Sequence, residues 1–152
     1  MQKGTYCIIF NINSKLTITV KSGKTYNLSK GTYAYIGSAW NSGGIKSRIK
    51  RHLKTKKRKH WHLDFITTSS QFEAKKIIAI PNEKVECEIA SLLNKIFKGI
   101  ESFGCSDCNC HSHLFKITNS QKLINILQNL YNIETYKPSL FTEEQIENKR
   151  NS

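Results

Sequence analysis

The chain has 152 residues, about one domain in length and enough for a hydrophobic core without cross-links. Hydrophobic residues make up 38% and aromatic residues 10%, a composition that excludes an intrinsically disordered protein. The 24 lysines and arginines outnumber the 11 acidic residues and give a formal net charge of +13. Such an excess predicts a polyanionic partner, and nucleic acid fits best.

The positive charge is concentrated in one segment. Between Lys46 and Lys59 there are nine lysines and arginines and no acidic residue. A charge that served only solubility would be spread evenly over the surface. The residues that we expect to contact nucleic acid are therefore Lys46, Lys50, Arg51, Lys54, Lys56, Lys57, Arg58 and Lys59.

The sequence carries neither a run of 18 apolar residues nor the pattern of a signal peptide. Its five cysteines are an odd number, and three of them crowd into one loop. A secreted protein held together by disulfides would show a more regular framework. We therefore expect a cytoplasmic protein without a membrane partner.

Strands dominate the N-terminal half of the chain. Residues 4–12 form an apolar, β-branched run, and residues 16–21 alternate between apolar and polar side chains. A short hairpin turn at Asn13 and Ser14 would join these two strands. Two further strands are expected over residues 26–28 and 31–37, the second ending at Gly37.

A basic helix over residues 43–53 follows these strands. Its buried stripe is formed by Ile45, Ile49 and Leu53. On a helical wheel Arg48 and His52 lie just beside this stripe, at the seam between helix and sheet. The lysines of the helix point further out. The alternative is a single solvated basic face, but the geometry favours the division.

The C-terminal half alternates between helices and strands. We expect strands over residues 72–80 and 113–118, helices over 84–97 and 123–130, and an irregular cysteine-rich loop over 99–113. Helix and strand are hard to separate over 60–65. The whole predicts one α/β domain of the α+β type over residues 1–135, with a small, mainly antiparallel sheet flanked by helices. A polar tail over 136–152 would follow, with a short helix over 142–149.

The helix expected over 84–97 carries two acidic residues near its start. On the wheel Glu86 lies at the rim of the apolar face, near Leu93, whereas Glu88 lies further round toward solvent. Glu86 is therefore the better candidate for an inward-facing ligand.

Several of these residues match a known signature in order and spacing. Gly4-Thr5-Tyr6 and Tyr35-Ile36-Gly37 resemble the two halves of the GIY-YIG nuclease signature, about thirty residues apart. Arg48 and His52 follow at the distances of the signature's arginine and histidine, and Glu86 on a later helix completes it. The middle residue of the first triplet is Thr instead of Ile, at a position that packs and does not react.

Longer motifs resemble one little-characterised branch of this family. They are Gly-Thr-Tyr-Ala-Tyr-Ile-Gly-Ser-Ala, Gly-Gly-Ile with Arg-His-Leu, His-Trp-His-Leu-Asp-Phe, and Phe-Gly-Cys-Ser-Asp-Cys-Asn-Cys-His-Ser-His-Leu-Phe. Some members of the branch are joined to repair glycosylases of the endonuclease III type. The resemblance covers residues 4–118. It implies a GIY-YIG nuclease-like fold and hydrolysis of phosphodiester bonds in DNA, during repair or processing of structured DNA.

The resemblance also implies a role for each matched residue. Glu86 would hold one Mg²⁺ or Mn²⁺ ion, which needs few carboxylates because it keeps several waters. Tyr6 would orient or deprotonate the attacking water, with its phenol shifted toward ionisation by nearby positive charge. Arg48 would clamp the phosphate. Tyr35 would bond a phosphate oxygen or support Tyr6, and His52 would be a second base or phosphate ligand.

The matched residues also have simpler structural or non-catalytic alternatives. Tyr6 could fill a sheet face, Arg48 could be a surface cation, and the choice of Tyr35 over Tyr33 rests on the motif alone. The protein could bind nucleic acid, DNA rather than RNA, without cutting it, or could be an interaction domain stabilised by zinc. Because no second recognition module is evident, a repair protein would be the partner that supplies specificity.

Two clusters of metal-binding residue types are not explained by the signature. His60, His62 and Asp64 would share a face if their segment is extended, beside the nucleic-acid groove; alternatively they form a hydrogen-bonded structural cluster. The second cluster could place Zn²⁺ at Cys105, Cys108, Cys110 and His113. True zinc sites usually combine two separated ligand pairs, and nine residues strain tetrahedral closure. The spacing therefore favours a loop that turns Asp107, Ser112 or His113 toward the active site.

Overall fold

The computed structural model describes residues 2–104 and 109–142. Its elements are β1 (Gly4–Ile12), β2 (Leu16–Thr19), β3 (Thr25–Leu28), β4 (Gly31–Ala39), α1 (Gly44–Leu53), α2 (Asp64–Thr67), β5 (Phe72–Pro81), α3 (Glu86–Ile96), β6 (Lys98–Gly99), β7 (Leu114–Ile117), α4 (Ser120–Leu130), β8 (Glu134–Tyr136) and the 3₁₀ helix η1 (Pro138–Phe141). No helix within those described ranges has both the length and the apolar character needed to span a bilayer.

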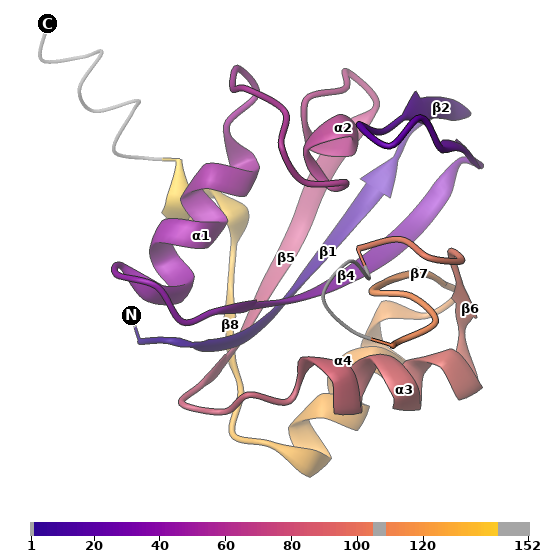
Figure 1. Ribbon diagram of the computed structural model, residues 1–152. Helices are drawn as coiled ribbons and strands as arrows, with labels where there is room; N and C mark the ends of the chain where they lie inside the picture. Colours follow the sequence, from indigo (N-terminus) through magenta and orange to yellow (C-terminus); the bar gives the residue numbers. More distant parts are fainter. Residues whose placement is uncertain (1, 105–108, 143–152) are drawn as a thin grey trace, which may run out of the picture.

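A six-stranded sheet forms the centre of the molecule, in the order β6-β7-β4-β1-β5-β8 (Figure 1). Every neighbouring pair is antiparallel. The apolar, β-branched sequence of β1 suits its central position, because strand residues there are buried on both faces of the sheet. This architecture confirms the predicted α+β class with an antiparallel sheet.

Alternate residues of β1 point to two separate hydrophobic clusters, as the two-residue period of a strand requires. Ile8 packs with α1 and α2 on one face, and Ile9 packs with α3 and α4 on the other. The helices therefore cover both faces of the sheet (Figure 1). Each helix contributes a single apolar stripe, such as Ile45 and Ile49 of α1.

The predicted hairpin between β1 and the following strand is wrong. Strand β1 pairs with β4 on one side and with β5 on the other, so both of its edges are occupied. Strand β2 instead pairs with β3 in a separate two-stranded sheet. The turn at Asn13 leads away from the main sheet, and the Asn13 amide donates to the Gln71 carbonyl.

The expected limits of two segments also differ from the structure. Strand β4 continues past Gly37 to Ala39, so this glycine does not end the strand. Residues after 135 are part of the fold, because Tyr136 pairs with β5 and Phe141 is 3% exposed against the core. Residues 143–149 of the helix expected at 142–149 lie outside the described part of the chain.

Gly37 makes room for a side chain of the neighbouring strand. It lies directly opposite Tyr6 in the β1–β4 register. A Cβ atom at Gly37 would lie 2.4 Å from the Tyr6 Oη and 2.5 Å from the Tyr6 Cζ. The Tyr6 phenol can therefore lie across the sheet only because position 37 has no side chain.

We predict that Gly37→Ala lowers the free energy of unfolding by about 1–3 kcal/mol, the usual cost of overpacking a core. Urea denaturation measures the change. In a Tyr6→Leu background, which lacks the outer atoms of the phenol, the same substitution should cost at least about 1 kcal/mol less, because contacting residues are energetically coupled. Equal costs in both backgrounds would show that Tyr6 is not what excludes a side chain at position 37.

Candidate active site

Tyr6 and Tyr35 stand on neighbouring central strands and point to the same face of the sheet. Tyr6 of β1 is 1% exposed, and Tyr35 of β4 is half-buried. Tyr35 faces Ile8, two residues from Tyr6, so the two tyrosines are diagonal neighbours. The predicted pair is therefore brought together by strand pairing alone.

His52 of α1 packs against both phenols. Its Nε2 lies 2.7 Å from the Tyr6 Oη, within hydrogen-bond distance. Its ring centroid lies 5.7 Å from that of Tyr6 and 6.0 Å from that of Tyr35. The second ring nitrogen, Nδ1, is buried and has no hydrogen-bond partner among the described residues.

Burial lowers the pKa of His52 to about 3, with a further contribution from the nearby Lys57 ammonium. Asp64 acts in the opposite direction but does not reverse the shift. His52 is therefore a neutral imidazole at physiological pH. A neutral ring can accept a proton at one nitrogen and carry a proton at the other.

Burial also decides the protonation of Tyr6. It raises the pKa of the phenol well above its usual value of 10.0, and Tyr35 adds to the effect. Arg48 lowers the pKa through its charge and a hydrogen bond, but less strongly. The expected effect of positive charge on this phenol is present, but burial outweighs it, so the net shift of the pKa is upward.

Arg48 lies at the seam between α1 and the sheet, as its place on the helical wheel indicates. Its Nη1 donates to the Ser38 carbonyl at 3.1 Å, and its guanidinium lies 4.5 Å from the centre of a Trp61 ring. It also interacts with Tyr6. Beside it lies a cavity of about 230 Å³, whose lining includes Arg48, Ser47 and Trp61.

Glu86 is the first residue of α3 and is half-buried. Its carboxylate is close enough to influence the pKa of both Tyr6 and His113. Glu88 is exposed and accepts a hydrogen bond from the Tyr131 hydroxyl. Glu86 is therefore the less exposed of the two and lies near enough to Tyr6 to affect it, in agreement with the choice made from the wheel.

The segment around Asp64 is a structural cluster, not an extended row of ligands. Asp64 is fully buried and accepts two hydrogen bonds of 2.9 Å from Arg51. It also accepts the backbone amides of His60 and Trp61, which fixes the turn into α2. Burial alone would raise the pKa of this carboxyl, but these hydrogen bonds outweigh it and hold the pKa well below the usual 3.8.

The histidines of this segment point to different places. His60 is exposed beside Trp61. His62 accepts the Gly104 amide at its Nδ1 and packs against Phe103. The structure therefore does not bring His60, His62 and Asp64 together as one constellation.

Two of the predicted nucleic-acid contacts are bound within the protein. Arg51 is held by Asp64 and lies 4.2 Å from the centre of a Trp61 ring. The Lys57 side chain is 7% exposed, and its Nζ donates to the backbone carbonyls of Arg51 and His52. Both residues support the loop after α1, and a sequence pattern of charges cannot separate such residues from exposed ones.

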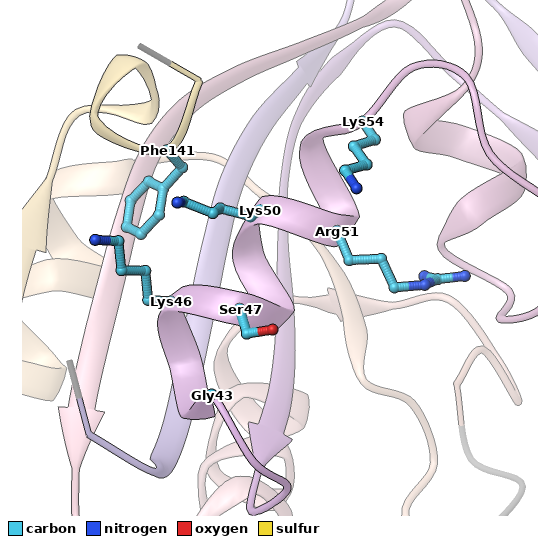
Figure 2. Close-up of a pocket in the computed structure, with 7 residues that line it drawn as sticks. All are labelled: Gly43, Lys46, Ser47, Lys50, Arg51, Lys54 and Phe141. Atoms are coloured by element: carbon cyan, nitrogen blue, oxygen red, sulfur yellow. The ribbon is translucent and has the colours of Figure 1, made fainter. Parts of the chain in front are cut away.

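The remaining residues of the basic segment are accessible. Lys46, Lys54, Lys56, Arg58 and Lys59 are exposed, and Lys50 is partly exposed. A cavity of about 700 Å³ runs along α1 and is lined by Gly43, Lys46, Ser47, Lys50, Arg51, Lys54 and Phe141. Figure 2 shows Lys46 and Lys50 reaching toward Phe141, whereas Arg51 extends to the other side of the helix.

A further group of metal-binding residue types lies beside Glu86. Single ligand atoms of Cys87, Cys110 and His113 all lie within 4.8 Å of one another. Cys105 and Cys108, candidate zinc ligands that the loop spacing disfavours, lie outside the described residues. The sequence reasoning missed Cys87, although its place next to Glu86 on the same helix was a usable signal.

We predict that Asp64→Asn lowers the free energy of unfolding by about 3–5 kcal/mol at pH 7, because it leaves the Arg51 and Lys57 charges without their buried partner. Urea denaturation measures this loss. Because the folded-state pKa lies below the unfolded value of 3.8, the contribution is present above pH 4 and is lost as the pH falls further. The difference from wild type should therefore shrink in acid.

The matched control is Glu73→Gln, which removes a carboxylate paired with Lys75 at 3.8 Å. Both side chains are about half exposed, so the substitution should cost less than about 1 kcal/mol. Similar losses for the two variants would contradict a special role for Asp64.

Comparison with known proteins identifies one protein family. No curated protein matches the chain, and no solved structure does. The family model described as domain of unknown function DUF123 matches residues 5–135, which include all five residues of the candidate active site. The chain therefore belongs to the DUF123 family.

Proposed function

We propose that the protein is a divalent-metal-dependent endonuclease of the GIY-YIG type that hydrolyses phosphodiester bonds in DNA. The observation that carries this proposal is the convergence of five side chains from β1, β4, α1 and α3. They are Tyr6, Tyr35, Arg48, His52 and Glu86. Hydrolysis needs a proton acceptor for water and positive charge at the phosphate, and this set can supply both.

The tyrosine and histidine of this set form a short proton path. As the Tyr6 Oη takes a proton from an attacking water, its own proton can pass to the Nε2 of His52 across 2.7 Å. His52 is neutral and can accept it. In this relay Tyr6 needs no stable ionised form, which fits its raised pKa.

Arg48 is the group best placed to bind the scissile phosphate. Its hydrogen bond to the Ser38 carbonyl uses one of five N–H donors and leaves others for an anion. It borders the cavity of about 230 Å³ that also includes the Ser47 side chain. A bidentate arginine contact would hold the phosphate in a fixed orientation beside Tyr6.

Glu86 fits a single Mg²⁺ or Mn²⁺ ion. It is half-buried, lies near Tyr6, and presents a hard oxygen ligand. Mg²⁺ commonly binds through one or two carboxylates and keeps several waters, so one glutamate suffices. The bound ion would supply Lewis-acid stabilisation of the leaving oxygen.

The exposed lysines of α1 and the following loop extend this site into a binding surface for DNA. They lie on the same segment as Arg48, so a duplex or branch bound along α1 would present its backbone to the site. Structured DNA in repair or processing is the substrate class that we propose. A repair protein would supply the specificity, and co-purification tests for it.

The pKa shifts of Tyr6 and His52 also support a second function, which is binding of nucleic acid without cleavage. The raised pKa of Tyr6 and the lowered pKa of His52 each make proton removal from water harder in the metal-free protein. That favours a module of the same fold that binds nucleic acid without cutting it. The two functions differ in whether phosphodiester bonds are broken.

We predict that the wild-type protein cleaves nicked, flapped or branched DNA in the presence of Mg²⁺ or Mn²⁺. Glu86→Gln and Tyr6→Phe should each reduce the rate at least about 100-fold, because each removes one of the groups on which the step depends. Gel electrophoresis of end-labelled DNA measures the rates, with single-stranded RNA as a second substrate.

Glu88→Gln is the matched control, because it makes the same change one helical half-turn away on the side that bonds Tyr131. It should leave the rate within about threefold of wild type, as a surface change usually does. Absence of cleavage by wild type would leave the non-cutting module as the better assignment. Equal cleavage by wild type, Glu86→Gln and Tyr6→Phe would contradict the roles given to these two residues.

We also predict that DNA binding weakens steeply with salt, because lysines that bind phosphates displace counterions from the DNA. The double variant Lys46→Ala/Lys54→Ala should reduce the slope of log K against log salt by about 2. Fluorescence anisotropy with Ca²⁺ in place of Mg²⁺ measures binding without cleavage. The control is Lys95→Ala/Lys122→Ala, which removes the same charge from α3 and α4 and should leave the slope unchanged. If both double variants reduced the slope equally, the DNA would not bind mainly along α1.

A further inference from the structure

Three sulfur and nitrogen ligands from separate parts of the chain meet at the start of α3. Cys87 is the second residue of this helix and is exposed. Cys110 lies in the loop before β7, and His113 directly precedes that strand. One ligand atom from each lies within 4.8 Å of the others.

This donor set fits zinc in particular. Two thiolates and one imidazole are the ligands that zinc prefers, whereas Mg²⁺ and Mn²⁺ prefer oxygen. Bonds of about 2.3 Å to sulfur and 2.0–2.1 Å to nitrogen in a tetrahedron separate these ligand atoms by about 3.5–3.8 Å. The observed spread needs a contraction of only about 1 Å to reach that geometry.

The cluster also avoids the strain of a zinc site built from the cysteine-rich loop alone. Cys105, Cys108, Cys110 and His113 lie within nine residues and strain a tetrahedral site. Cys87 comes from a helix that precedes the loop, so ligands now approach from two separated parts of the chain. Such separation is the usual arrangement in structural zinc sites.

His113 is held in position independently of any ligand. Its backbone amide donates to the Phe103 carbonyl, and its carbonyl accepts the Ile36 amide, both at 2.9 Å. A further hydrogen bond links its side chain to the Ile36 backbone. Zinc-binding histidines commonly have one such outer hydrogen bond, which orients the ring toward the metal.

We propose that Cys87, Cys110 and His113 bind a zinc ion, with water in its fourth position, that links the loop after β6 to the first turn of α3. Gly104 of this loop lies against Tyr35 of the candidate active site. A Cβ atom at Gly104 would lie 3.3 Å from the Tyr35 ring and 3.4 Å from the His113 Cβ, so these groups pack closely. The zinc site uses other ligands than Glu86, and its existence does not depend on nuclease activity.

The test is the zinc content of protein purified with reductant and without chelator, measured by mass spectrometry of the metal. Wild type should carry about one zinc per chain, and Cys87→Ser, Cys110→Ser and His113→Asn should each lose at least about tenfold. Because Cys87 is exposed, its serine variant leaves the core intact. Removing zinc from wild type with a chelator should lower Tm.

Two matched controls separate ligands from neighbours. His111→Asn changes an exposed histidine of the same loop, and Cys7→Ala changes a buried cysteine of β1 outside the cluster. Both should keep their zinc. Co²⁺ should replace zinc in wild type and give the visible spectrum of a tetrahedral site with thiolate ligands, and Cys87→Ser should lose that spectrum.

Three outcomes would overturn the proposal. The first is wild type that carries no zinc and binds no Co²⁺. The second is Cys87→Ser that keeps its zinc while Cys105→Ser and Cys108→Ser lose it, which would confine the site to the loop. The third is a disulfide between Cys87 and Cys110 that mass spectrometry finds in protein purified with reductant. None of these measurements uses DNA, so failure of the zinc site and failure of the nuclease assignment are distinguishable.

Discussion

The buried contact between the Tyr6 phenol and His52 is the interaction on which the rest of the site depends. Burying a hydroxyl without a partner is costly, and His52 lies within hydrogen-bond distance of it, while Arg48 also bonds it. The contact joins the central strand β1 to helix α1, and the absence of a side chain at Gly37 makes room for it. Position, packing and protonation of the site therefore follow from one pair of residues.

The basic segment can pack against Tyr6 and His52 because one carboxylate compensates part of the segment's positive charge. Asp64 is fully buried and draws Arg51 and Lys57 inward, toward the loop that follows α1. Without it, several cations would crowd a neutral histidine in a desolvated region, at high electrostatic cost. The segment consequently divides in two: an inner layer that builds the loop, and an outer layer of lysines that face solvent.

Sequence reasoning succeeded where a local pattern determines the answer and failed where partners are distant in the chain. The strand at β1 and the wheel positions of Arg48 and Glu86 follow from local periodicity. The hairpin at Asn13 was wrong because pairing of β1 with β4 and β5 takes both of its edges. Charge runs and loop spacing likewise could not show that Asp64 holds Arg51, or that Cys87 joins the cysteine-rich loop.

The pKa shifts of Tyr6 and His52 limit the bases that the site can offer. Tyr6 and His52 are both held in their neutral forms by burial, so neither is a strong base before ligands bind. A divalent ion at Glu86 would favour the ionised phenol, whereas the phosphate bound by Arg48 would favour protonated His52. Each ligand therefore eases one half of the same proton transfer. In the endonuclease that we propose, such a site would stay inert toward water until metal and DNA are both bound.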